Sequence, residues 1–240
     1  MLKIGSCELG ERPRVVAAVS DGVPRKDAEV LLASGVDILE LRVDTFSRCD
    51  TDHVVDEAAR HAGLPLLATI RSAAEGGGWK GTEAERLALF RAVMPHVGAV
   101  DIELSSTDIL GDVVAGARTA ALTVIGSHHD FNETPADGDL DAVVEAGAGA
   151  GVDIVKVAAR CNSPTDLRRL AAFTLRHADR PMVVIGMGSA GMLSRVFFPA
   201  LGSLLTYTFL GAPSAPGQLN SEDTVKYLKL FYGHLDEGSS

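Results

Sequence analysis

One lysine lies in the middle of an apolar run, and its position points to covalent chemistry. Lys156 is the fourth residue of DIVKV, residues 153–157, a pattern typical of a buried parallel strand. An ammonium buried without a partner costs several kcal/mol or gives up its proton, and a neutral lysine amine is a nucleophile towards carbonyl carbons. In the alternative interpretation, Lys156 pairs with a carboxylate at a strand end and only stabilises the fold.

Two adjacent histidines belong to the densest titratable cluster, SHHDF at residues 127–131. Neighbouring residues of a strand point to opposite faces, so His128 and His129 are not expected to bind one metal. No HxH, HExxH or CxxC pattern accompanies them. We therefore predict that one histidine acts as a general base near neutral pH. The alternative is a histidine that is only fixed in a hydrogen-bond network.

Charged residues spaced two apart occupy two further runs. Glu40, Arg42 and Asp44 alternate with apolar residues, so a strand would point all three to the same side. Asp101 and Glu103 share a side in the same way, either as an acid/base couple or as partners that orient arginines. The alternative for the first group is a buried ion-pair network that only stabilises the structure.

A glycine-rich segment follows Arg71. It reads SAAEGGG over residues 72–78, and three glycines after a strand predict a mobile loop near a substrate. Arg71 is then expected to bind an anionic group, and Glu75 to transfer protons or to orient another residue. The alternative is an ordinary surface loop with a solvated Glu75.

The elements that position these residues are repeated strand and helix units. Short apolar runs alternate with helix-length segments, which is typical of helices around a parallel sheet. The eight runs cover residues 14–20, 37–43, 65–71, 99–104, 123–128, 153–157, 181–186 and 204–209. Eight units in 240 residues predict a single domain over residues 1–240 with the α/β (β/α)₈ TIM-barrel fold. Barrel active sites lie at the C-terminal ends of the strands, where the polar residues described above are found.

Helices are expected between these runs. Residues 25–33, 52–61 and 84–93 mix charged and apolar positions as amphipathic helices do, and the Ala- and Gly-rich residues 136–149 are also predicted to be helical. Ser163 and Pro164 match an N-cap followed by a first-turn proline, so a further helix is expected to run to about residue 177. Residues 236–240 are predicted to be a flexible tail.

A doubly wound sheet is the competing architecture. GMGSAG at residues 186–191 follows a run and formally fits GxGxxG. It falls late in the chain, however, and no acidic residue closes a strand about 20 residues further on, as a dinucleotide site requires. A turn that binds an anionic group is the preferred interpretation of this segment.

Composition excludes several classes of function. The formal net charge of −10, from 32 acidic and 22 basic residues, argues against nucleic acid as a partner. No long apolar stretch is free of charges, and the N-terminal residues lack the apolar segment of a signal peptide, so no membrane role is expected. The cysteines, Cys7, Cys49 and Cys161, are few and widely spaced, which predicts free thiols and a cytoplasmic location.

Six ordered motifs resemble those of the type I 3-dehydroquinate dehydratases, the 3-dehydroquinase family of the shikimate pathway for aromatic amino acid biosynthesis. They are ELRVD (40–44), RS with EGG (71–72 and 75–77), SHHDF (127–131), VK (155–156), MLSR (192–195) and SAPGQ (214–218). The resemblance spans nearly the whole chain. It implies a hydro-lyase that converts 3-dehydroquinate to 3-dehydroshikimate by syn elimination of water, without a cofactor or metal.

The resemblance also implies the catalytic roles. Lys156 would form a Schiff base with the C3 ketone, and His129 would remove a C2 proton and then protonate the departing C1 hydroxyl. Glu75 would orient or tune His129. The iminium serves as the electron sink, because the carbanion delocalises into it as an enamine.

The substrate contacts follow from the same resemblance. Arg195 would bind the substrate carboxylate, since a guanidinium can donate two parallel hydrogen bonds. Ligands of the ring hydroxyls, or supports of the lysine, would be Glu40, Arg42, Arg71, Ser214 and Gln218. Asp101 and Glu103 are expected to support other residues, and Ser20 to lie at the barrel mouth. Residues 211–218 would fold over the ligand as a loop, unless they form a static turn.

Two other functions remain open from the sequence. A class I aldolase also uses a Schiff-base lysine on the sixth barrel strand, and a catalytically silent domain that binds sugar acids could keep the same barrel. Intact Lys156, His129 and Glu75 argue against the silent domain. The family suggests a homodimer.

Overall fold

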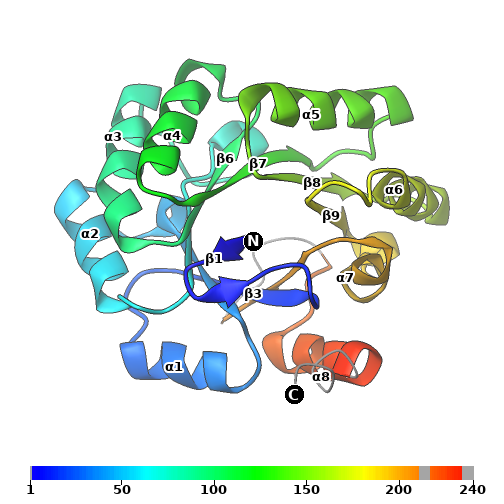
Figure 1. The fold of residues 1–240 in the computed structure, drawn as a ribbon, viewed down its shortest axis with the longest axis horizontal. Coiled ribbons are helices and arrows are strands. Elements are labelled where there is room, and N and C mark those ends of the chain that lie inside the picture. The colour runs from blue at the N-terminus through cyan, green and yellow to red at the C-terminus, as the bar shows by residue number, and fades with distance from the viewer. Residues whose placement is uncertain (1, 211–216, 234–240) are drawn as a thin grey trace.

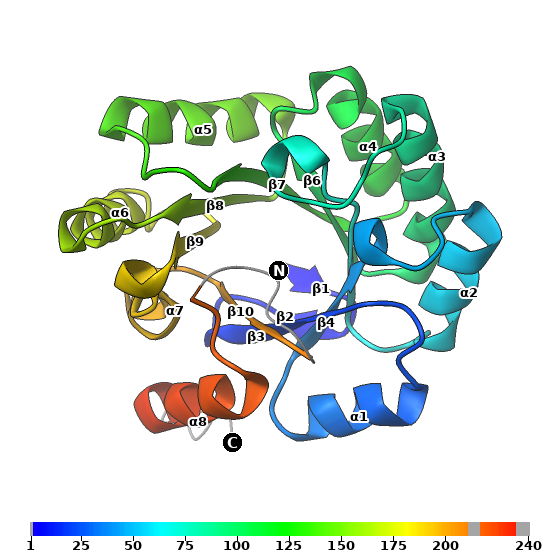
Figure 2. The same cartoon turned by 180° about the vertical axis from the view of Figure 1, so that it is seen from behind.

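The computed structural model describes residues 2–210 and 217–233, and within them eight parallel strands form a nearly closed barrel (Figures 1 and 2). The barrel strands are β3 (Arg14–Val19), β4 (Ile38–Arg42), β5 (Leu66–Thr69), β6 (Ala99–Glu103), β7 (Thr123–Asp130), β8 (Ile154–Arg160), β9 (Met182–Met187) and β10 (Leu205–Phe209). Their order in the sheet is β10-β3-β4-β5-β6-β7-β8-β9. A single bridge between Met182 of β9 and Ser203, which precedes β10, joins the two ends of this sheet. The predicted (β/α)₈ barrel is therefore confirmed, and the doubly wound sheet is excluded.

Helices surround the barrel as the sequence predicts. They are α1 (Arg25–Ala33), α2 (Thr51–Arg60), α3 (Glu83–Val93), α4 (Thr107–Thr119), α5 (Asp137–Ala150), α6 (Pro164–Arg176), α7 (Ser194–Phe197) and α8 (Ser221–Tyr232). Short 3₁₀ turns are η1 (Val43–Thr45), η2 (Ala73–Glu75), η3 (Met94–His96), η4 (Ser189–Gly191) and η5 (Phe198–Leu201). Ser163 caps α6, with Pro164 in its first turn, as predicted. The predicted tail at residues 236–240 lies outside the described residues.

Two strands extend beyond their predicted ends. β7 continues to Asp130, so both histidines lie in the strand, and β8 continues to Arg160. Alternation then divides the residues of β8 between two environments. Val155 and Val157 pack with Leu140 of α5 and Leu170 of α6, whereas Lys156 points into the barrel. The strand can therefore be apolar on its outer face and still carry an amine inside.

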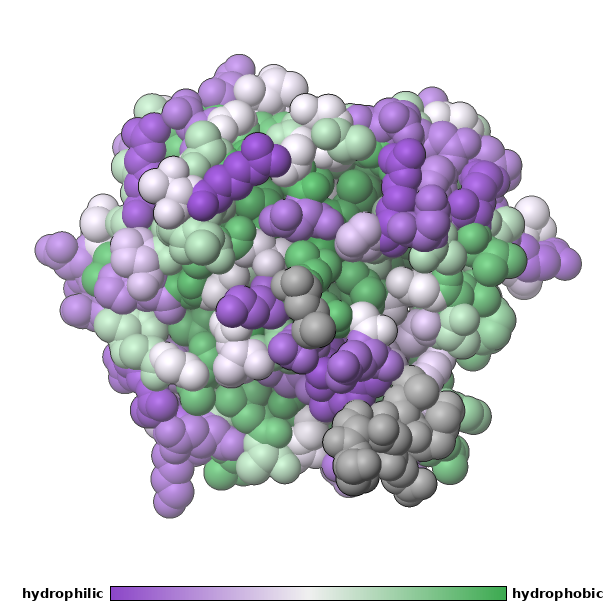
Figure 3. All heavy atoms as spheres, viewed as in Figure 1, coloured by the Kyte–Doolittle hydropathy of each residue, from purple (hydrophilic) through white to green (hydrophobic). Residues whose placement is uncertain are grey.

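A short hairpin at the start of the chain, which was not predicted from the sequence, closes one end of the barrel. Strands β1 (Lys3–Ile4) and β2 (Cys7–Glu8) pair antiparallel, and β1 lies near the barrel axis in both views (Figures 1 and 2). Ile4 is fully buried against inward residues at the N-terminal ends of strands, including Ile38 and Leu67. The hairpin fills this end, so the cavity lies at the other end, where the strands terminate. Figure 3 shows hydrophilic side chains both around the rim of this face and near its centre, with apolar residues between them.

Candidate active site

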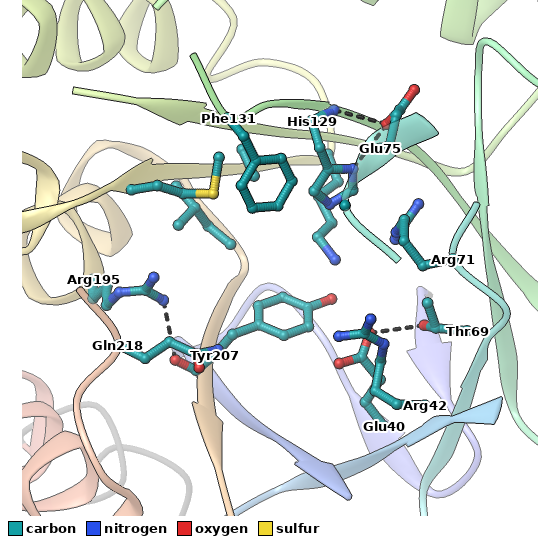
Figure 4. Close-up of a pocket in the computed structure, with 15 residues that line it drawn as sticks. Glu40, Arg42, Thr69, Arg71, Glu75, His129, Phe131, Arg195, Tyr207 and Gln218 are labelled. Atoms are coloured by element: carbon teal, nitrogen blue, oxygen red, sulfur yellow. Dashed lines mark hydrogen bonds and ion pairs between the residues drawn. The ribbon is translucent and has the colours of Figure 1, made fainter. Parts of the chain in front are cut away.

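A cavity lies at the C-terminal ends of the barrel strands and encloses about 540 Å³ of empty space, including its open mouth. Its lining residues are Glu40, Arg42, Thr69, Arg71, Glu75, Gly76, His129, Phe131, Lys156, Ala158, Ile185, Met187, Arg195, Tyr207 and Gln218 (Figure 4). Residues from widely separated motifs thus meet in one site. The expected lysine, histidine and arginines are among them.

Lys156 is buried at the floor of this cavity. Its Nζ lies 2.9 Å from Asp101 Oδ2 and 4.1 Å from the centroid of the Tyr207 ring. The carboxylate and the ring face both favour a positive charge on this nitrogen. The lysine is thus held in one place by a partner on β6 and another on β10.

Asp101 connects the lysine to Arg71. Its Oδ1 accepts hydrogen bonds from Arg71 Nη2 and Ser127 Oγ, each at 2.6 Å. Burial alone would raise the pKa of Asp101, but the positive charges of Arg71 and Lys156 hold it well below its usual range. Asp101 is therefore ionised at neutral pH and acts as a counter-ion for both cations.

A row of alternating charges continues behind Arg71. Arg71 Nη1 lies 3.1 Å from Glu103 Oε1, and Glu103 Oε2 lies 3.0 Å from Arg86 Nη2. The Arg86 and Glu103 side chains are at most 1% exposed. Glu103 does not line the cavity. The expectation that Asp101 and Glu103 orient arginines therefore matches their contacts.

His129 is bound to Glu75 by two hydrogen bonds. Glu75 Oε2 lies 2.8 Å from the backbone N–H of His129 and 3.0 Å from its Nδ1. Burial, together with the charges of Arg71 and Lys156, lowers the pKa of His129 well below its ordinary value, so the ring is neutral at pH 7. With Glu75 ionised, Nδ1 carries the hydrogen that it donates. Nε2 is then the basic nitrogen.

The glycine-rich segment after β5 is a tight turn, where the sequence predicts a mobile loop. Gly77 N–H donates to the Ser72 carbonyl at 2.9 Å, and Gly78 N–H donates to Asp44 Oδ2 at 2.9 Å. A Cβ at position 77 would lie 2.1 Å from the Arg71 carbonyl oxygen. The glycines permit close backbone packing, which places the buried Glu75 next to His129.

Residues of β4 and β5 form the next part of the wall. Arg42 donates two hydrogen bonds to Asp44, at 3.0 and 2.8 Å, and Glu40 Oε1 accepts from Thr69 Oγ1 at 2.7 Å. Asp44 lies in η1 beyond the strand. Glu40 and Arg42 both line the cavity, so they point to the same side of the strand as predicted. Asp44 does not line the cavity and instead binds Arg42 from the following turn.

Arg195 lies on the opposite side of the cavity from Glu75 (Figure 4). Its Nε donates to the Gly217 carbonyl at 2.9 Å and its Nη1 to the Tyr207 carbonyl at 3.2 Å. Among the described residues no carboxylate pairs with it, and its buried Nη2 makes no hydrogen bond there. Burial lowers the pKa of Arg195 to about 10. A buried guanidinium with a free donor fits an anionic ligand.

Other predicted residues lie elsewhere or outside the described chain. Ser20 is exposed, does not line the cavity, and donates to Asp21 Oδ1 at 3.2 Å. His128 does not line the cavity either. Ser214 falls within residues 211–216, outside the described residues, as does most of the predicted loop 211–218.

Part of the cavity wall was not predicted from the sequence. Tyr207 lies under the lysine, and an apolar surface is formed by Phe131, Ala158, Ile185 and Met187. The signal available for Tyr207 was strand alternation in the eighth run, which places it on the inner side of β10. The GMGSAG segment forms the end of β9 and η4, where Gly191 packs so closely on Gly186 that a Cβ would lie 2.4 Å from the Gly186 carbonyl carbon.

Two further properties of the described residues concern metal ions and membranes. No group of three or more His, Cys, Asp or Glu side chains among them could hold a metal ion. In the same part of the chain, no helix has the length and apolar character needed to cross a bilayer.

The comparisons with known proteins agree with one another. The 3-dehydroquinate dehydratase of Methanococcoides burtonii is 37% identical over 234 residues, covering 96% of this chain and 99% of that protein. The crystal structure of the Geobacillus kaustophilus 3-dehydroquinate dehydratase superposes with a TM-score of 0.89 at 28% identity, covering 97% of this chain and 96% of that one. The type I enzyme of Clostridium difficile, solved with covalently modified comenic acid, gives a TM-score of 0.86 at 26% identity, with 97% and 98% coverage. The model of the type I 3-dehydroquinase family matches residues 20–234, and the chain belongs to that family.

Proposed function

We propose that this protein dehydrates 3-dehydroquinate to 3-dehydroshikimate in the shikimate pathway, through a Schiff base on Lys156. One observation carries the proposal: a buried lysine and a neutral histidine share a cavity with an arginine that lacks an anionic partner among the described residues. Membership of the family supplies the substrate.

The proposed reaction begins at Lys156. Its ammonium releases a proton, and the freed amine adds to the C3 carbonyl to give a carbinolamine. The released proton then goes to the carbinolamine hydroxyl, which leaves as water, so that a protonated imine remains. Removal of a C2 proton leaves an electron pair that delocalises into the C=N⁺ group as an enamine. The pair then returns to expel the C1 hydroxyl, which leaves as water with a proton from the enzyme. Hydrolysis of the iminium releases the product and restores the amine.

His129 is suited to both proton transfers in this scheme. Its lowered pKa leaves it unprotonated at neutral pH, and the Glu75 contact directs the hydrogen to Nδ1. Nε2 can accept the C2 proton and later donate it to the leaving oxygen. One residue acting on both groups requires that they leave from the same face of the ring, so we propose a syn elimination.

Asp101 is assigned as the counter-ion of the lysine. It is held ionised by Arg71 and Lys156, so it stabilises the resting ammonium and then the iminium, which carries the same charge. In the alternative interpretation, a carboxylate partner meant that Lys156 only stabilises the fold. The ion pair with Asp101 is also compatible with a catalytic lysine. Tyr207 adds its ring face to the same stabilisation, worth about 0.5–2 kcal/mol.

Arg195 is assigned to the substrate carboxylate, because its free donor is buried and has no acidic partner in the described residues. The ring hydroxyls are assigned to Glu40, Arg42, Arg71, Gln218 and Ser214. The first four line the cavity, whereas the role of Ser214 rests on the family resemblance. Glu103 is assigned to hold Arg71 from behind.

The test of this proposal is an absorbance assay. Conversion of 3-dehydroquinate to its conjugated enone should produce a new ultraviolet absorbance, and sugar phosphates offered as aldolase substrates should not be cleaved. Retro-aldol cleavage without dehydration would favour the aldolase. Absence of both, with tight binding of 3-dehydroquinate, would favour a silent binding domain.

We also propose a cytoplasmic homodimer. Its support is the family resemblance, three free cysteines and exposed apolar side chains on two neighbouring helices, among them Phe197 of α7 and Leu230 and Phe231 of α8. Light scattering should give twice the mass of one chain. Replacement of Leu230 by Lys should shift that mass towards the monomer, and a wild-type monomer would overturn the proposal.

A further inference from the structure

The Glu75 carboxylate has a third hydrogen-bond donor outside the cavity. Ser105 Oγ donates to Glu75 Oε1 at 2.5 Å, while Oε2 faces His129. Ser105 lies in the loop after β6, is exposed and does not line the cavity. The turn after β5, the loop after β6 and strand β7 itself therefore meet at one carboxylate.

We infer that Ser105 is a positioning residue that acts through Glu75 on His129. This inference rests on the proposed function, in which His129 is the base. A carboxylate bound through one oxygen can rotate about its last bond, and the Ser105 hydrogen bond removes that freedom. With Oε1 held, Oε2 stays in place for both the backbone N–H and Nδ1 of His129. Nε2 therefore remains directed at the substrate as the basic nitrogen.

The Ser105 hydroxyl also affects the pKa of Glu75, together with burial and the neighbouring charges. Burial raises the pKa of Glu75, and Glu103 of β6 adds to the rise. The Ser105 hydrogen bond opposes it, together with the charges of Arg71 after β5 and His128 of β7. Only ionised Glu75 can accept from both N–H groups of His129 on Oε2 without donating a proton itself. Ser105 thus helps to keep the carboxylate in its accepting form.

Ser106, which follows Ser105, contacts different residues. Ser106 Oγ donates to Glu103 Oε2 at 3.1 Å and also contacts Arg86. It therefore belongs to the row of charges behind Arg71, whereas Ser105 belongs to the histidine. Because Ser105 is exposed, removing its hydroxyl should leave the core packing intact.

The experiment compares Ser105→Ala with Ser105→Thr, and with Thr107→Ala as a control at an exposed position in the first turn of α4. For Ser105→Ala we expect kcat at pH 7 to fall about 3- to 10-fold and the acidic limb of its pH profile to move up by about half to one pH unit, the scale of one hydrogen bond. The hydroxyl of Ser105→Thr should restore both. Thr107→Ala should change neither.

A second readout separates the base from the lysine. Borohydride trapping of the Lys156 adduct should give the same yield in Ser105→Ala as in the wild type, while a substrate deuterated at C2 should show a larger isotope effect. An unchanged pH profile, or equal losses in trapping and turnover, would overturn the inference. A wild-type protein without dehydratase activity would instead overturn the proposed function, so the two failures are distinguishable.

Discussion

The two sides of the cavity differ in whether their charged side chains have a partner of opposite charge among the described residues. On the lysine side, formed by β6, β7 and β8, Lys156 pairs with Asp101 at 2.9 Å and His129 with Glu75 at 3.0 Å. On the arginine side, formed by β9, β10 and α7, the guanidinium of Arg195 donates hydrogen bonds only to backbone carbonyls among the described residues. The reacting groups therefore have charged partners within the described residues, whereas the arginine has none there and can bind the anionic group of a ligand.

This difference indicates how binding and chemistry are divided. Pre-positioned donors and charges lower a barrier because they need no reorganisation during the reaction. A buried guanidinium without an anion carries a desolvation cost, which an incoming carboxylate can offset. We therefore expect changes on the lysine side to affect kcat and changes on the arginine side to affect KM.

The largest effect is expected from Lys156→Ala. Without the amine no iminium forms, so turnover should fall by more than about 10⁴-fold, the scale seen when a covalent nucleophile is removed. The measurement is the enone absorbance with saturating 3-dehydroquinate. Lys26→Ala, an exposed lysine of α1, is the matched control and should keep full activity. Residual turnover near the wild-type level would rule out covalent catalysis by Lys156.

His129→Ala should have the second largest effect. Loss of a general base typically costs about 10²–10⁴-fold, and kcat should fall by that amount while borohydride still traps the lysine adduct. A histidine away from the cavity, His96 of η3, provides the control, and His96→Ala should turn over close to the wild-type rate. Full activity of the His129 variant would exclude it as the base.

Arg195→Lys tests the arginine side. Lysine keeps the charge but loses the planar pair of donors, so KM should rise about 10- to 100-fold with a smaller change in kcat. Arg176→Lys on α6, where the arginine is partly exposed, should leave KM unchanged. An Arg195 variant with wild-type KM would show that the substrate carboxylate binds elsewhere.

The smallest effect at neutral pH concerns stability. The pKa of Asp101 is depressed in the folded protein, so the unfolded chain binds its proton first as the pH falls. The stabilisation is fully present above the unfolded value of about 3.9 and is lost below it. In urea titrations below pH 4, the free energy of unfolding of the wild type should fall more steeply than that of Asp101→Asn, by about 1.4 kcal/mol per pH unit. Equal slopes would contradict the depressed pKa.

The barrel and its central residues could be predicted because the signals were local. Alternation in DIVKV placed Lys156 inside the barrel, and the capping sequence at Ser163 marked the start of α6. The ends of β7 and β8 were predicted too early, since both strands continue past the end of their predicted runs. The N-terminal hairpin was missed because its strands have only two residues each.

What could not be predicted depends on contacts between distant segments. The turn after Arg71 is tight because Gly77 packs on the Arg71 backbone and Gly78 on the Asp44 carbonyl of η1, which composition alone does not reveal. The lack of an acidic partner for Arg195 within the described residues, and the hydrogen bond from Ser105 to Glu75, both depend on tertiary arrangement. Ser20 is at the end of the first predicted run but is exposed, because its hydroxyl faces Asp21 and the Thr45 carbonyl.

The central claim is a covalent bond between Lys156 and the substrate. Incubation with 3-dehydroquinate and sodium borohydride, followed by digestion and mass spectrometry, tests it directly. We expect a reduced adduct on the peptide that contains Lys156, and none when borohydride or substrate is left out. An active enzyme that yields no adduct, or an adduct on a different lysine, would contradict the mechanism.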